Sequence, residues 1–130
     1  MEYVVGIILG LAIGAAATLI GFDRDRSFYP TVLTVIATYY VLFAVMGGSY
    51  DVLVIEILVA VGFFLAAIMG FSRSLWVVAA ALIAHGVFDY IHHALIDNSA
   101  VPDWWPGFCL AIDATLGLWL AGILWKRSNQ

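Results

Sequence analysis

The chain has 130 residues, of which 65% are hydrophobic and only 11% are charged, with a formal net charge of −4. Because soluble globular domains carry about 25% charged residues, this composition excludes that class and indicates an integral membrane protein. The acidic balance and the five scattered basic residues exclude nucleic acid as a partner. The predicted partner is the lipid bilayer.

Five apolar stretches are each close to the roughly 20 residues that span the hydrocarbon core of a bilayer. They cover residues 3–21, 29–46, 52–69, 75–96 and 107–125. The connections are short and polar, and no linker or low-complexity segment divides the chain. We therefore predict an all-α integral membrane bundle of five transmembrane helices, in a single domain over residues 1–130.

The basic residues predict the orientation of this bundle. Arg24 and Arg26 lie in the first connection, Arg73 lies in the third, and Lys126 and Arg127 follow the last span. Under the positive-inside rule this pattern places the N-terminus outside and the C-terminus in the cytoplasm. The expected location is the cell (inner) membrane, as a multi-pass protein.

The first stretch carries three glycines at intervals of four residues, namely Gly6, Gly10 and Gly14. It lacks the basic n-region and the cleavage site of a signal peptide, so we expect a transmembrane helix. Small residues at this spacing let two helix backbones approach closely. The glycine face predicts packing inside the bundle or, alternatively, contact with a second copy or with a partner in a membrane complex.

The fourth stretch contains all three histidines of the chain. At about 100° per residue, with His85 at zero, Asp89 lies near +40°, His92 near −20° and His93 near +80°. Three potential ligands therefore share one helix face, and His93 lies at its edge. Ionisable groups inside a membrane are costly, so such a cluster is a functional-site hypothesis by default.

Other spans carry polar residues at a similar depth. At about 1.5 Å per residue, Asp89, Asp113 and Glu56 all lie within roughly 10 Å of the predicted outer boundary, and His85 about 16 Å below it. Tyr39 and Tyr40 fall in the same layer. We expect a polar chamber in the outer half of the membrane.

Two kinds of chemistry fit this chamber, since a buried carboxylate must be neutralised, paired or metal-bound. The first is a divalent metal ion, Zn, Fe, Mn or Cu, held by imidazole nitrogen and carboxylate oxygen. The second is a metal-free hydrogen-bonded network that holds or passes protons. A cluster near the lipid interface without a chemical role is the remaining alternative.

The metal hypothesis gives each polar residue a role. The predicted ligands are His85, Asp89, His92 and Asp113, with Glu56 as general base or orienting residue and His93 as proton shuttle or alternative ligand. Cys109 lies one turn before Asp113 and is a ligand for a soft metal, a nucleophile or a small buried hydrophobe. As the only cysteine, it excludes an internal disulfide.

The tract His85-Gly86-x-x-Asp89-x-x-His92-His93, followed by Val101-Pro102-x-Trp104-Trp105-Pro106-x-Phe108-Cys109-x-x-x-Asp113, resembles a family of small bacterial integral membrane proteins. In that family the tract reads HGxWDxxHH and then VPxWYPxFCxxYD. Phe88, Trp105 and Ile112 stand where the family has Trp, Tyr and Tyr. The resemblance covers mainly the last two spans and implies no particular reaction.

The leading expectation for function is a hydrolase or oxidoreductase with an intramembrane metal site that acts on a lipid-like substrate. The alternative is a non-enzymatic module, either a proton or ion conductor or an accessory subunit of a membrane complex. Its motivating features are the small size and the glycine face of the first span.

Overall fold

The computed structural model describes residues 1–130, which form helices and no strands. The elements are α1 (Glu2–Ile20), the short 3-10 helix η1 (Phe22–Arg24), α2 (Phe28–Ala37), α3 (Tyr39–Gly47), α4 (Tyr50–Ser72), α5 (Leu75–Leu95) and α6 (Trp105–Ser128). With α2 and α3 counted as one span, five helical segments are long and apolar enough to cross a membrane. The chain is thus an all-helical protein with five candidate membrane spans, as the apolar stretches predicted.

Local sequence signals set the helix ends. Gly21 and Gly48 adopt positive φ values of 95° and 73° and end α1 and α3, a conformation that glycine reaches without steric cost. The hydroxyls of Ser49 and Ser74 accept hydrogen bonds from the backbone at the starts of α4 and α5. Pro106 lies in the first turn of α6, where its missing N–H removes no helical hydrogen bond.

The second span is broken at Thr38, although the sequence predicted one continuous helix there. The Thr38 backbone N–H donates to the Val35 carbonyl at 3.1 Å, and the Thr38 hydroxyl donates to the same oxygen at 2.7 Å. This tight turn ends α2, and α3 starts at the next residue. Tyr39 and Tyr40 are the first two residues of α3.

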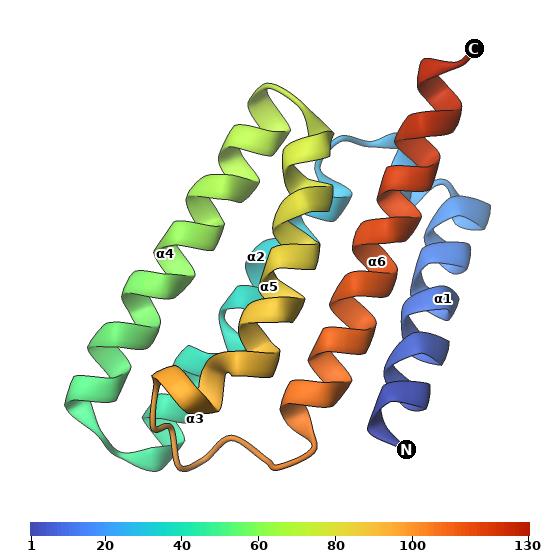
Figure 1. The fold of residues 1–130 in the computed structure, drawn as a ribbon. Helices are drawn as coiled ribbons and strands as arrows, with labels where there is room; N and C mark the ends of the chain where they lie inside the picture. The colour runs from blue at the N-terminus through green and yellow to red at the C-terminus, as the bar shows by residue number, and fades with distance from the viewer.

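The helices α4, α5, α6 and α1 lie side by side in a row, with α2 and α3 behind α4 and α5 (Figure 1). The two chain termini lie at opposite ends of the bundle (Figure 1). We call the end that carries the C-terminus and the α1–α2 and α4–α5 connections the basic end, because the five Arg and Lys residues all lie in or beside these segments. The opposite end, with the α3–α4 and α5–α6 connections, is the loop end.

Apart from Asp23 at the basic end, the buried polar residues lie in a different half of the bundle from the apolar core. The core includes Val78, Ala79 and Leu82 of α5, in the half nearer the basic end, together with Leu116 and Leu120 of α6. The buried polar residues of α5 follow further along, from His85 onward. The half of the bundle nearer the loop end is therefore where a polar site can form.

The glycine face of α1 packs against α6 of the same chain. A Cβ atom added at Gly6 would lie 2.6 Å from the Phe108 carbonyl oxygen, and one at Gly10 would lie 2.8 Å from Cβ of Thr115. Gly14 lies equally close to the Trp119 ring. The close helix approach predicted from the glycine spacing is thus made between α1 and α6 of one chain. An oligomer through this glycine face stays a prediction, and the burial of the three glycines does not favour it.

Candidate metal centre

The polar face of α5 is buried as its spacing predicts. The exposed fractions are 2% for His85, 0% for Asp89 and 2% for His92, whereas His93 is exposed. The first three residues point into the bundle because they lie within a narrow arc of the helix. The arc that the sequence identified is therefore the inward-facing side of α5.

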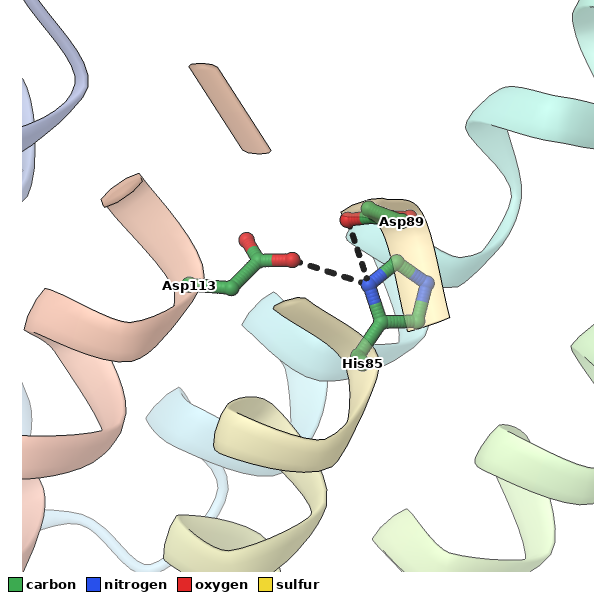
Figure 2. A group of neighbouring side chains, drawn as sticks. All are labelled: His85, Asp89 and Asp113. Carbon is green, nitrogen blue, oxygen red and sulfur yellow. Dashed lines mark hydrogen bonds and ion pairs between the residues drawn. The ribbon is translucent and has the colours of Figure 1, made fainter. Parts of the chain in front are cut away.

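One ring nitrogen of His85 faces two carboxylates. Nδ1 lies 2.9 Å from Oδ2 of Asp113 on α6 and 3.1 Å from Oδ2 of Asp89, one turn further along α5 (Figure 2). Asp113 is 0% exposed. The edge of the Phe63 ring lies against the same imidazole, with ring centroids 4.6 Å apart, so the group is enclosed by protein on that side.

A single N–H group cannot satisfy both carboxylates. The His85 nitrogen makes its hydrogen bond to Asp113, and both carboxylate oxygens of Asp89 and Oδ1 of Asp113 are left without a hydrogen-bond partner. Buried polar atoms are nearly always paired, and an unpaired one costs about 1–3 kcal/mol, more when charged. The group therefore has an excess of acceptors, which a cation or additional protons would satisfy.

The same three side chains form a candidate metal-binding group. One ligand atom from each of His85, Asp89 and Asp113 lies within 4.8 Å of the other two. Imidazole nitrogen and carboxylate oxygen are common ligands of divalent transition metals. The group could hold a metal ion, and we refer to these three residues as the His85 group.

His92 belongs to a second cluster, although the sequence placed it with the predicted metal ligands. Its Nε2 atom lies 2.5 Å from Oε1 of Glu56 on α4. The Asn98 side chain, from the α5–α6 connection, donates to the same Glu56 oxygen at 3.4 Å and to the Tyr40 carbonyl at 3.1 Å. Side chains or carbonyls from α3, α4, α5 and the α5–α6 connection thus meet around one buried imidazole. We call the four residues the His92 cluster: Tyr40, Glu56, His92 and Asn98.

The axial distance along α5 explains the separation. His92 lies seven residues beyond His85, which corresponds to about 10 Å of helix rise at 1.5 Å per residue. The two imidazoles share a face but lie at different levels, and the Phe88 ring lies near both, with centroids 6.1 Å from His85 and 5.5 Å from His92. The structure therefore brings together three of the four predicted metal ligands and leaves His92 with Glu56.

His93 lies at the edge of a polar cavity of about 670 Å³ at the loop end. His92 and Asn98 also line this cavity, with the acidic residues Glu2, Asp97 and Asp103. The His92 cluster thus borders the cavity, whereas no residue of the His85 group lines it.

Two members of the His92 cluster were difficult to identify from sequence. Asn98 lies in a connection with no periodic pattern, so no signal indicates which way its amide points. Tyr40 was predicted at a similar depth, but nothing in the sequence indicates that its ring stacks on His92. Cys109 is buried, with 4% of its surface exposed, and lies outside the His85 group.

Searches against models of known protein families, curated proteins and solved structures found no match to this chain. The resemblance of the last two spans to a family of small membrane proteins stays a prediction. The two buried clusters and their surroundings are therefore the features that indicate a function.

Proposed function

We propose that the protein holds one divalent metal ion at His85, Asp89 and Asp113 and uses it to hydrolyse or oxidise a lipid-like substrate. The observation that carries this proposal is the convergence of three buried ligand atoms within 4.8 Å of one another. The same group contains three carboxylate oxygens without a donor. Polar groups kept at such a cost inside a membrane generally have a function.

Charge balance also favours a divalent ion. Two ionised aspartates and one neutral imidazole carry a charge of −2, and a divalent cation brings the total to zero. Uncompensated charge in a medium of low dielectric constant costs many kcal/mol. The ion would also bind the carboxylate of Asp89, neither oxygen of which accepts a hydrogen bond, so one ligand satisfies both the charge and this buried carboxylate.

The number of protein ligands favours a reactive site over a purely structural one. Structural zinc sites use four protein ligands, whereas catalytic sites use three and keep a position for water or substrate. A metal ion in such a position polarises a bound carbonyl or activates a water molecule. His92, outside the ligand set, is hydrogen-bonded to Glu56 and lines the cavity beside His93, so this pair is suited to exchange protons with that cavity.

The orientation proposed for the bundle follows from the basic end. If that end faces the cytoplasm, as the positive-inside rule requires, the His92 cluster and the polar cavity lie toward the extracytoplasmic side of the cell membrane. The substrate would then be processed in the outer half of the bilayer.

Metal analysis of the purified protein tests the proposal. Wild type, His85→Ala and Asp113→Asn are purified from cells supplied with Zn, Fe, Mn or Cu, and metal per chain is measured by mass spectrometry. We expect about one ion per chain in wild type and a loss of most of it in both variants, because His85→Ala removes one of three ligands and Asp113→Asn replaces a carboxylate ligand by a neutral amide.

His93→Ala is the matched control, since it removes a histidine of the same helix that lies outside the His85 group. This variant should keep the wild-type metal content. Asp113→Asn preserves side-chain size, and a circular dichroism spectrum shows whether each variant is folded. Wild-type protein without stoichiometric metal under every supply would overturn the proposal.

Proton conduction is a second candidate, and one observation favours it. His92 is hydrogen-bonded to Glu56 and also borders the loop-end cavity, so an ionisable pair connects the bundle interior with that cavity. Proton flux into liposomes would then require the pair, and Glu56→Gln should abolish it. Metal-free wild type that conducts protons would favour this candidate, whereas metal-bound protein without flux would exclude it.

A further inference from the structure

A cavity of about 520 Å³ separates the second span from α6 and α1. The helices α2 and α3 pack on α4 and α5, whereas α6 packs on α5 and α1. The cavity occupies the space between these two sets of helices. Its volume is within the range of about 300–1,000 Å³ that is typical of ligand sites.

The cavity walls are apolar, but its inner side reaches the His85 group. Eleven of the thirteen lining residues are hydrophobic, including Val32, Ile36 and Phe108. Asp113 is the only carboxylate among them, and Cys109 lies beside it, one turn earlier on α6. Asp113 is 0% exposed and its Oδ1 atom accepts no hydrogen bond.

Partly exposed residues at the rim give access from the bilayer. Ile13 of α1 is 39% exposed and Tyr39 of α3 is 38% exposed, and both line the cavity. Both residues lie inside helices of membrane-spanning length. The hydrocarbon region of the bilayer therefore supplies the molecules that enter here, and apolar walls exclude strongly hydrated solutes.

We infer that this cavity binds the hydrocarbon chain of a membrane lipid whose polar end donates a hydrogen bond to Asp113, as a long-chain alcohol does. The apolar walls accommodate the chain, and the unpartnered acceptor selects a donor at its end. This lipid site rests on the proposed function in one respect, because the metal ion at the His85 group would act on the alcohol held beside Asp113.

Photolabelling tests this assignment. Wild-type protein in phosphatidylcholine vesicles is irradiated with a long-chain primary alcohol that carries a diazirine on its chain, and the labelled residues are mapped by mass spectrometry. The label should be concentrated on cavity residues such as Ile36 and Phe108. The methyl ether of the same probe lacks the donor, and its labelling there should be weaker by about fivefold, the effect of one lost hydrogen bond of about 1 kcal/mol.

A pair of variants on α1 gives the control. Ile13→Trp fills the rim of the cavity and should reduce labelling to background. Leu9→Trp introduces the same ring on the same helix at a residue that is 42% exposed and does not line the cavity, so it should leave labelling unchanged. Label spread evenly over the lipid-facing helices, or equal labelling by alcohol and ether, would overturn the inference.

Metal content measured on the same samples separates the two proposals. Cavity labelling by the alcohol without bound metal would support the lipid site and overturn the metal centre. Bound metal without cavity labelling would support the metal centre and overturn the lipid site. Ile13→Trp lies outside the His85 group, so it should retain the metal content of wild type.

Discussion

The ring of Tyr40 lies flat on the imidazole of His92, with ring centroids 3.8 Å apart and planes inclined by 8°. Tyr40 is 2% exposed and follows the break at Thr38 by two residues. Its carbonyl accepts the Asn98 hydrogen bond, so the same residue fixes both the imidazole and the α5–α6 connection. Tyr40, near the start of α3, thus connects two other members of the His92 cluster.

Truncation of Tyr40 should destabilise the bundle. Tyr40→Ala removes a buried ring and leaves a cavity, and we expect a loss of about 3–5 kcal/mol in the free energy of unfolding. The Tyr40 hydroxyl has no hydrogen-bond partner, so Tyr40→Phe should be neutral or stabilising. Unfolding in mixed micelles with increasing SDS measures both variants, and a large loss in Tyr40→Phe would contradict a Tyr40 hydroxyl without a hydrogen-bond partner.

Removal of the metal ion should lower the thermal stability of the metal-loaded protein. A ligand that binds only the folded state stabilises it by about 2.7 kcal/mol when its free concentration is 100 times Kd. A membrane-permeable chelator should therefore reduce the Tm of wild type and of His93→Ala. Asp113→Asn should show no chelator effect, and an unchanged Tm in metal-loaded wild type would count against the site.

The contact between α1 and α6 should not tolerate a side chain at Gly6. A Cβ atom there would meet the Phe108 carbonyl and the Ala111 side chain at 2.6 and 2.7 Å, and overpacking of this kind costs about 1–3 kcal/mol. Gly62 of α4 has no neighbour within 4 Å of the corresponding position. Gly62→Ala should therefore raise the free energy of unfolding by up to about 1 kcal/mol, whereas Gly6→Ala should lower it. Unfolding in SDS measures both variants, and equal effects of the two substitutions would contradict the packing of α1 on α6.

Reporter fusions test the orientation. Green fluorescent protein fused after Gln130 should fluoresce, because the basic end is expected in the cytoplasm. Alkaline phosphatase fused to a chain truncated after Gly48 should be active outside. The reverse pattern would mean that the basic end faces the extracytoplasmic side.

Much of the fold could be predicted because hydrophobicity and helix length follow directly from the order of the residues. The five apolar stretches match the helical segments to within a few residues at each end. The break at Thr38 was not predicted, because threonine is also common in unbroken spans and the turn depends on how α2 and α3 pack on α4. The inward face of α5 was predictable, since helix geometry fixes the angle between residues.

The sequence by itself determined which residues are polar, which helix face they share and roughly how deep they lie, because the period and rise of a helix are constant. It could not determine which carboxylate faces which imidazole, since that choice depends on how neighbouring helices rotate and pack. Only the tertiary structure assigned Asp113 to His85 and Glu56 to His92. The single polar chamber predicted from sequence is therefore two clusters, separated along α5 because residues seven apart share a face but not a level.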